Sequence, residues 1–79
     1  MVYYVYILYS DRFDRFYIGQ TNNINLRLRH HNFGKSSWTK SYRPWRLIHS
    51  ESFQTRTKAM QREKYLKSLK DKRYLLRFL

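Results

Sequence analysis

A run of β-branched and aromatic residues near the start of the chain, Val2–Tyr9, constrains the fold more than any other feature. These residue types favour the extended backbone of a β-strand, and here both alternating faces of the strand are apolar. We therefore expect a central strand that is covered on two sides. The run is far shorter than the roughly 20 residues of a membrane-spanning helix, so we interpret it as a buried strand and not as a membrane anchor.

Two further segments have the character of strands. Phe16–Gln20 follows the polar, turn-prone stretch Ser10–Arg15, which predicts an antiparallel hairpin with the first strand. This hairpin should bring Tyr6 and Tyr17 close together. Trp45–Phe53 alternates apolar and polar residues, which predicts a third strand at an edge of the sheet with one exposed face.

Helix signals follow the hairpin. Thr21–Asn23 supplies capping side chains for a helix that begins at Ile24, and Gly34 is placed to end it. Arg27 and His31 lie one turn apart on this predicted helix.

The rest of the chain predicts a loop and two more helices. Lys35–Pro44 has no sustained period and should be a surface loop, a place where substrate contacts are common. After Thr55, apolar residues recur at helical spacing up to about Lys70; they are Ala59, Met60, Leu66 and Leu69. A short last helix, Lys72–Phe78, opened by Asp71, should pack as a lid on the core.

The 79 residues predict a single α+β domain, residues 1–79, with a three-stranded antiparallel sheet and flanking helices. A chain of this length buries only about 60% of the surface that its unfolded form exposes. There is no cysteine and no zinc-ligand spacing, so aromatic and aliphatic packing has to stabilise the fold.

Charge predicts the partner. The chain has seventeen Lys and Arg residues and five Asp and Glu residues, which gives a net charge of +12. Such a positive charge attracts polyanions in a salt-dependent way. DNA is the expected partner, with RNA as an alternative, and a basic protein that meets RNA only as an assembly component is a further reading. A membrane surface is disfavoured because the basic residues are interleaved with aromatic ones. The first thirty residues show no secretory signal, so we expect a cytoplasmic location.

Glu63 is the most informative single residue. On a helical wheel it lies between Ala59, Met60 and Leu66, on the face expected to turn toward the sheet. A carboxylate there needs a partner. One reading is Mg²⁺, which accepts one or two carboxylates together with water and phosphate oxygens. The other is an ion pair with Lys67, one turn further on.

The tyrosines divide into two groups. Tyr6 and Tyr17 should lie near the N-terminal cap of the first helix, where backbone N–H groups also favour phosphate. A phenol with a reference pKa of about 10 is a poor base, but neighbouring cations favour the phenolate: Arg27, Arg29, Lys35 and a metal. The remaining tyrosines considered are interpreted as packing residues: Tyr3, Tyr4, Tyr9, Tyr65 and Tyr74.

Arg27 and His31 complete the candidate site. The planar guanidinium of Arg27 suits phosphate oxygens. His31 either hydrogen-bonds or passes a proton to a neighbouring tyrosine, or it is a solvated histidine at a helix end. His30 should point elsewhere, and His49 lies on the third strand without an obvious partner. Five further basic residues are candidates for nucleic-acid contacts: Arg29, Lys35, Lys40, Arg43 and Lys67.

These residues resemble those of the GIY-YIG nuclease superfamily over essentially the whole chain. Tyr17-Ile18-Gly19 resembles the second half of the family name, and Tyr6 matches the tyrosine of the first half. Arg27, His31 and Glu63 fall where the family has its helix residues and its metal-binding glutamate. Further positions resemble short stand-alone members, which are related to the N-terminal nuclease domain of the excision-repair C subunit: Gly34, Lys35, Thr39 and Pro44-Trp45.

Two positions depart from the family pattern. Tyr4 and Val5 stand where the family name has glycine and isoleucine, so the first triplet keeps only its tyrosine. A late asparagine of some larger members has no counterpart after Glu63, and Lys67 or Lys70 stands near that position.

The resemblance implies hydrolysis of a phosphodiester bond with one metal ion. Tyr17 would deprotonate the attacking water with help from His31, and Tyr6 would position that water. Arg27 would hold the scissile phosphate. Glu63 would bind Mg²⁺ or Mn²⁺, which would stabilise the departing oxygen. Larger relatives have attached DNA-binding domains, so we expect weak or shape-based specificity here.

Three functions therefore remain open. The first is a metal-dependent DNA endonuclease acting in DNA repair or recombination. The second is a nucleic-acid-binding module on the same scaffold with little or no catalysis. The third is a small subunit that lends its domain to a larger complex with another protein. No Ser/His/Asp order, glycine-rich phosphate loop or paired-carboxylate motif supports another catalytic class.

Overall fold

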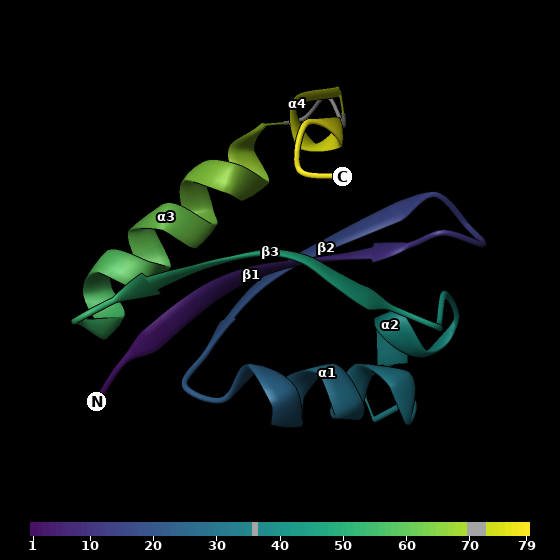
Figure 1. Cartoon of the computed structure of the whole chain (residues 1–79), viewed down its shortest axis with the longest axis horizontal. Coiled ribbons are helices and arrows are strands. Elements are labelled where there is room, and N and C mark those ends of the chain that lie inside the picture. Colours follow the sequence, from purple (N-terminus) through teal and green to yellow (C-terminus); the bar gives the residue numbers. More distant parts are fainter. Residues whose placement is uncertain (36, 70–72) are drawn as a thin grey trace.

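The computed structural model describes residues 1–35, 37–69 and 73–79. They form an antiparallel sheet with the strand order β2-β1-β3 (Figure 1). The strands are β1 (Tyr3–Ser10), β2 (Arg15–Thr21) and β3 (Arg46–Phe53). The predicted α+β fold, the hairpin and the central first strand are therefore confirmed, and β3 lies at an edge as expected.

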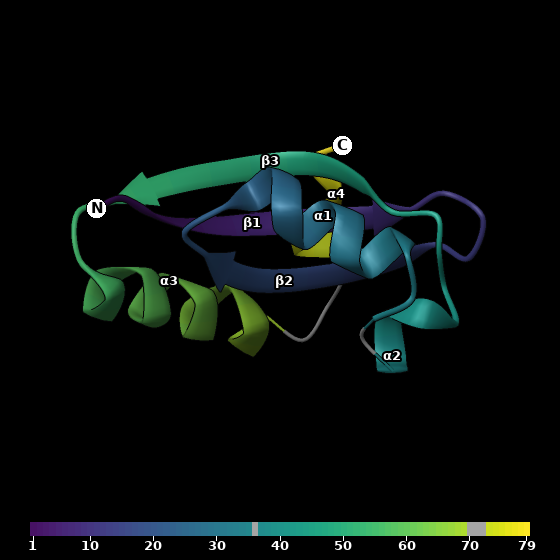
Figure 2. The same ribbon diagram turned by 90° about the horizontal axis from the view of Figure 1, so that it is seen from below.

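Helices cover both faces of the sheet (Figures 1 and 2). One face carries α1 (Ile24–Asn32) and the short α2 (Ser37–Lys40), and the other carries α3 (Arg56–Ser68) and α4 (Arg73–Leu76). In Figure 2, α3 runs alongside β2 at the edge of the sheet. Within the described residues, none of these helices has the length and apolar character needed to cross a membrane.

The alternation of β1 separates two cores. Val5 and Ile7 pack on the α3 side in a cluster with Ile18, Ala59 and Leu66. Tyr6 and Leu8 point to the α1 side and pack with Trp45. Because consecutive side chains of a strand point to opposite faces, one apolar run supplies both cores.

The predicted helix caps are present. The Asn23 side chain accepts a hydrogen bond from the backbone N–H of Leu26 at 3.1 Å and opens α1. Gly34 has φ +78°, a left-handed conformation that glycine adopts without strain, and it follows the end of α1. Thr55 accepts from the N–H of Lys58 at 3.2 Å and opens α3.

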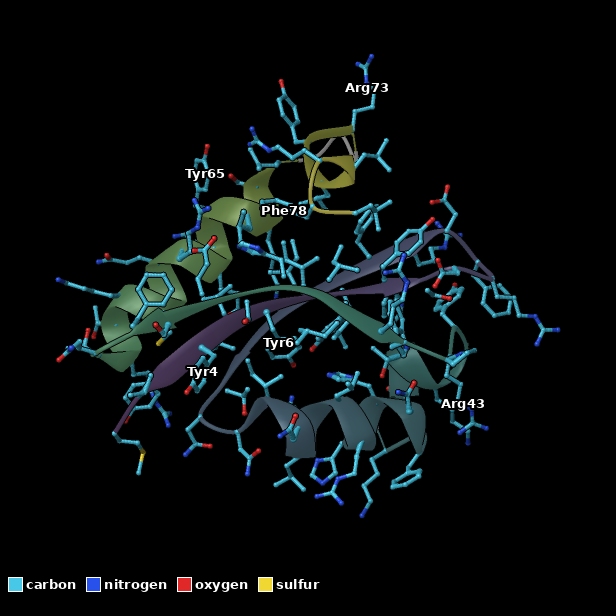
Figure 3. The ribbon with its side chains drawn as sticks, viewed as in Figure 1. Tyr4, Tyr6, Arg43, Tyr65, Arg73 and Phe78 are labelled. Atoms are coloured by element: carbon cyan, nitrogen blue, oxygen red, sulfur yellow. The ribbon has the colours of Figure 1, made fainter. Side chains whose placement is uncertain are left out.

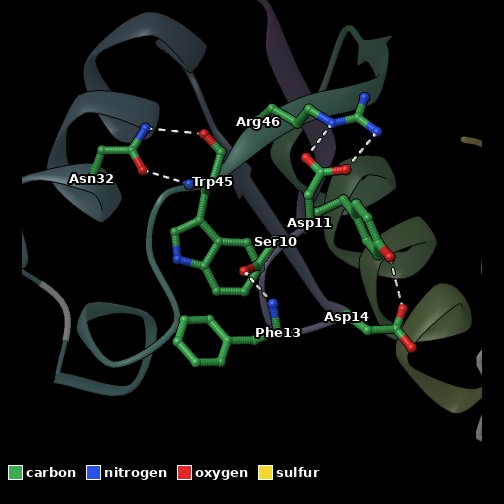
Figure 4. A network of polar contacts seen from close by, with 8 residues as sticks. Ser10, Asp11, Phe13, Asp14, Asn32, Trp45 and Arg46 are labelled. Carbon is green, nitrogen blue, oxygen red and sulfur yellow. Dashed lines mark hydrogen bonds and ion pairs between the residues drawn. The ribbon is translucent and has the colours of Figure 1, made fainter.

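Side-chain bonds also define the hairpin turn (Figure 4). The hydroxyl of Ser10 accepts from the N–H of Phe13 at 3.4 Å, and the Tyr9 hydroxyl donates to Asp14 at 2.8 Å. Arg46 of β3 donates to Asp11 at 2.7 Å, which ties the turn to the opposite edge strand.

The prediction of a loop over Lys35–Pro44 was wrong in part, because α2 lies within it. Four residues are too few to show a helical period in a sequence. This turn is held by tertiary contacts: Thr39 is fully buried, and its backbone oxygen accepts from the indole N–H of Trp45 at 2.9 Å.

Fewer residues of α3 face the sheet than the sequence predicted. Met60 is 51% exposed, whereas Ala59 and Leu66 are buried. A helix at the edge of a sheet buries a narrow stripe, so a residue one position away already faces solvent. Packing was also the wrong interpretation for Tyr65 and Tyr74, which are 53% and 54% exposed.

The last helix is confirmed over Arg73–Leu76, and Leu75 is buried in the core as a lid residue. The predicted end of α3 at about Lys70 and the opening of the last helix by Asp71 lie outside the described residues, and α3 itself ends at Ser68.

Candidate active site

A chain of three buried polar groups lies between the sheet and α1. The Tyr6 hydroxyl is 3.1 Å from Nε2 of His31, and Nδ1 of the same ring is 2.9 Å from the Thr39 hydroxyl. Both ring nitrogens are therefore engaged, and His31 is 1% exposed. The reading of His31 as a solvated helix-end residue was wrong. The hydrogen bond goes to Tyr6, whereas Tyr17 contacts the ring with centroids 4.6 Å apart.

Gly19 makes room for Tyr6. The two residues pair across β1 and β2, and the tyrosine ring lies over the glycine. A Cβ atom at position 19 would lie 2.6 Å from the Tyr6 hydroxyl oxygen and 3.1 Å from a ring carbon of Tyr17. Cβ atoms essentially never approach another atom to 2.6 Å, and 3.1 Å is already tight, so the close approach of Tyr6 and Tyr17 favours glycine at this position.

The environment of Tyr6 keeps its hydroxyl protonated. Burial raises the pKa of Tyr6 above its usual value, and the nearby Tyr17 and Glu63 act in the same direction. Hydrogen bonding to Arg27 acts in the opposite direction but is outweighed. The expectation that cations favour the phenolate was therefore wrong for Tyr6, because desolvation is the larger effect.

The same burial keeps His31 neutral. Desolvation lowers the pKa of the His31 imidazole, and the charges of Arg27 and His30 lower it further. A neutral imidazole has one donor and one acceptor nitrogen. A consistent arrangement has Tyr6 donating to Nε2 and Nδ1–H donating to Thr39, which fixes the direction of the Tyr6 hydroxyl.

Arg27 faces both tyrosines and a polar hollow. Hydrogen bonding to Tyr6, and less so to Tyr17, raises its pKa, so the guanidinium stays charged. Its buried Nε has no hydrogen-bond partner within the described part of the chain. A hollow of about 240 Å³, which we name the Arg27 hollow, is lined by Arg27 together with Tyr3, Thr21 and Arg56. The two guanidinium groups that line this hollow, those of Arg27 and Arg56, suit an entering anion.

Glu63 lies at the margin of this arrangement. Its side chain is 19% exposed, and Oε2 pairs with Nζ of Lys67 at 2.9 Å. The predicted ion pair is thus present. Glu63 also lines a groove of about 510 Å³ along α3, and its charge acts on the Tyr6 hydroxyl. The carboxylate is therefore both paired and open to a surface groove.

The donor set fits a hard cation that keeps most of its own water. No cluster of three or more His, Cys, Asp or Glu side chains that could hold a metal occurs within residues 1–35, 37–69 and 73–79. Glu63 is then a single carboxylate ligand, which is compatible with Mg²⁺ or Mn²⁺ because Mg²⁺ commonly takes one or two carboxylates, water and phosphate oxygens.

The five predicted nucleic-acid contacts lie in different places. Lys67 borders the site through its pair with Glu63. The other four are exposed on the α1–α2 side of the molecule: Arg29, Lys35, Lys40 and Arg43. Arg43 points away from the sheet in Figure 3, and its guanidinium lies against Gly34.

His49 has a partner that the sequence did not suggest. Its Nε2 is 2.7 Å from Glu51, and Glu51 also accepts two hydrogen bonds from Arg62 of α3 at 2.8 and 3.0 Å. Arg62 and His49 both lower the pKa of Glu51, Arg62 the more strongly. The His49 ring contacts Phe78 at 4.4 Å between centroids, so this network fastens β3 to the α3–α4 side.

Sequence reasoning gave no role to three residues that shape the site. Thr39 orients His31, and Arg56 borders the Arg27 hollow. Asn32 donates to the backbone oxygen of Trp45 at 3.0 Å and accepts from its N–H at 2.6 Å (Figure 4). Thr39 had been noted as a family resemblance, but no spacing signal linked any of them to the tyrosines.

The fold and this site define the class of the protein. The sequence model of the GIY-YIG catalytic domain matches residues 2–75, and the chain belongs to the GIY-YIG family. The family places it in a nuclease superfamily.

The relatives narrow the class to the UPF0213 proteins. A UPF0213 protein of Bacillus licheniformis is 44% identical over 71 residues, which are 89% of this chain and 72% of that protein. The UPF0213 protein YazA of Bacillus subtilis is 47% identical over 58 residues, 72% of this chain and 59% of YazA. The solution NMR structure of the UPF0213 protein BH0048 from Bacillus halodurans superposes with a TM-score of 0.59 at 30% identity, over 96% of this chain and 81% of that one.

Proposed function

We propose that this protein is a metal-dependent endonuclease that hydrolyses phosphodiester bonds in DNA, acting as one domain in DNA repair or recombination. The observation that supports it best is the convergence of groups on the Tyr6 hydroxyl. His31 hydrogen-bonds to that hydroxyl. The charges of Tyr17, Arg27 and Glu63 act on it. These side chains come from β1, β2, α1 and α3, and together they supply a base, a cation and a metal ligand.

Tyr17 and Tyr6 have different roles in this proposal. Tyr17 lines an open cleft and takes the proton from the attacking water. Tyr6 is buried and keeps its proton, because its pKa is raised, and donates that proton to His31. Its oxygen therefore holds the water by accepting a hydrogen bond from it. His31 and Thr39 are positioning residues that fix the Tyr6 hydroxyl.

Arg27 and Glu63 act on the phosphate. The guanidinium of Arg27 lies ready beside Tyr6 and holds the non-bridging oxygens of the scissile phosphate, where charge builds up during the reaction. Glu63 would hold the metal ion with its carboxylate, which lines the groove along α3. A bound Mg²⁺ or Mn²⁺ supplies positive charge that stabilises the departing oxygen.

The test is cleavage of labelled single-stranded, duplex and branched DNA with Mg²⁺, Mn²⁺ or EDTA. We expect metal-dependent products that are lost in Glu63→Gln and in Tyr17→Phe, by about 10²-fold or more. Two matched controls keep full activity. Asp11→Asn removes an exposed carboxylate that pairs with Arg46, and Tyr65→Phe removes an exposed hydroxyl on the outer side of α3 (Figure 3).

Undiminished cleavage in both site variants would refute the assignment. Salt-sensitive binding with no cleavage of any substrate would instead support a binding module. The Glu63–Lys67 pair favours that second candidate, because a metal has to compete with Nζ for the carboxylate.

A further inference from the structure

We propose that a cleft beside Trp38, which we name the Trp38 cleft, binds one unpaired nucleobase of a nucleic-acid strand, stacked on the Trp38 indole. The cleft lies between β2, α2, α3 and α4, next to Tyr17. The inference rests on the proposed function for the place of the scissile phosphate, whereas the binding of the base does not require cleavage.

Trp38 is a large aromatic side chain that is half exposed and packs on other aromatic rings. It is 48% exposed, and its ring contacts Tyr42 at 4.9 Å, Trp45 at 6.0 Å and Tyr17 at 6.2 Å between centroids. Trp45 beneath it is 3% exposed and is held at both backbone polar groups by Asn32. A rigid, exposed indole is the kind of platform on which bases stack without sequence preference.

The Trp38 cleft has the size and walls for a flat ring. Its volume is about 350 Å³, near the lower end of the roughly 300–1,000 Å³ of small-ligand sites. Leu66 and Leu75 form apolar walls, and Lys67 at the margin forms an ion pair with Glu63. A base in the cleft would therefore place its own phosphate beside the groups proposed to act on it.

The charges favour a nucleic-acid strand over an apolar protein segment. Among the described residues that line the Trp38 cleft, Lys67 is the charged one. Above the same aromatic cluster, the guanidinium of Arg15 lies 5.3 Å from the Tyr42 ring. The ligand must also be unpaired, because a base inside a duplex is already stacked on both faces and cannot enter a side cleft.

The test compares two ligands of equal length and charge: an oligothymidylate and an oligomer of abasic sugar-phosphates. Dissociation constants are measured in EDTA, so no cleavage occurs, with the wild type, Trp38→Ala, Trp38→Phe and the control Tyr65→Ala, whose ring is similarly exposed but lies on the outer side of α3 (Figure 3). Oligouridylate and duplex DNA complete the set and distinguish DNA from RNA and unpaired from paired strands.

We expect Trp38→Ala to weaken oligothymidylate binding about 5- to 150-fold, the equivalent of about 1–3 kcal/mol for one stacked base. Binding of the abasic oligomer stays within about twofold, since phosphate contacts alone remain. Trp38→Phe retains most of the affinity and excludes misfolding as the cause, and Tyr65→Ala binds like the wild type.

Equal losses for both ligands, or no loss for either, would overturn the inference. So would a wild type that binds duplex DNA more tightly than the single strand. A Trp38-dependent preference for thymidylate without cleavage of any DNA would keep the base cleft and reject the hydrolytic function. A wild type that binds neither ligand would reject both.

Discussion

The two faces of the sheet bury different kinds of side chain. The α3 face buries aliphatic side chains such as Val5, Ile7 and Leu66. The α1 face buries Tyr6 and Trp45 together with polar His31 and Thr39. Aliphatic burial is non-directional and stabilises in proportion to area, whereas buried polar groups have to be paired at defined angles. The α3 face therefore supports the fold, and the α1 face holds side chains in fixed directions.

This difference explains why the candidate site is at the β2 edge. There, the charge of Glu63, which α3 brings from the other face, acts on the hydroxyl of Tyr6. Neither face alone contains a base, a phosphate-binding cation and a metal ligand. The comparison predicts that changes in the aliphatic core of the α3 face alter stability, and that changes in the polar groups of the α1 face alter chemistry.

The largest expected effect is on stability. Ile7→Ala empties a fully buried position on the α3 face and should cost about 2–5 kcal/mol, while Ile7→Val should cost about 0.5–1.5 kcal/mol. Urea unfolding measures both. DNA cleavage per folded molecule should stay at the wild-type level, and a loss of specific activity in the Val variant would contradict the division between the faces.

Arg27→Ala should have a comparable effect on the reaction. Loss of a preorganised cation lowers the cleavage rate by about 10²–10³-fold, or about 2.7–4 kcal/mol. Arg12→Ala, in the turn between β1 and β2, is the matched control, because its side chain is exposed and lines none of the three hollows. Similar losses of activity in the two variants would mean that general charge, and not the site, governs cleavage.

Gly19→Ala should lower both the stability and the cleavage rate. The new Cβ would meet the Tyr6 hydroxyl at 2.6 Å, so the ring has to move and its hydrogen bond with His31 is lost. We expect a cost of about 1–3 kcal/mol in stability and a fall in the cleavage rate. Tyr6→Phe in the same background removes the closest clashing atom, and partial recovery of stability would confirm the cause.

The smallest expected effect is a pH dependence from His31. Its folded pKa is lowered, so the unfolded state binds the proton more readily, and stability falls as pH drops below about 6.5 toward the folded value. The slope cannot exceed about 1.4 kcal/mol per pH unit for one proton. Above pH 6.5 this contribution is fully present.

Urea midpoints at several pH values check this dependence. His31→Gln should flatten the slope. His30→Gln leaves the Tyr6–His31–Thr39 hydrogen bonds in place and should keep most of it, because burial of His31, and not the charge of His30, is the main cause of the lowered pKa. Glu51 does not interfere, because its pKa is lowered from the ordinary carboxyl range and its effect appears only at more acidic pH. Equal slopes in the wild type and His31→Gln would contradict the assignment.

Local patterns predicted most of the fold. Val2–Tyr9 identified the central strand, and the caps at Asn23 and Thr55 marked both long helices. These signals act within a few residues, so they can be read without the partner elements. The four residues of α2 are too few to give such a signal. The exposure of Met60 depends on where α3 meets the sheet.

The candidate residues Tyr6, Tyr17, Arg27, His31 and Glu63 came from the sequence through order and family resemblance, and the structure brings them together. Their connections did not come from the sequence. The bond from His31 to Thr39 and the pairing of His49 with Glu51 are contacts between side chains whose neighbours are set by packing. Residue type alone did not reveal those partners.

The sequence by itself determined the strand that is covered on both sides, the positions of the caps and the strong positive charge. The tertiary structure decided which groups are desolvated, and that reversed the expected pKa direction of Tyr6. It also placed Trp38 half open above a buried Trp45. Burial, distance and hydrogen-bond direction depend on where several elements meet, and a linear pattern of residues does not contain that geometry.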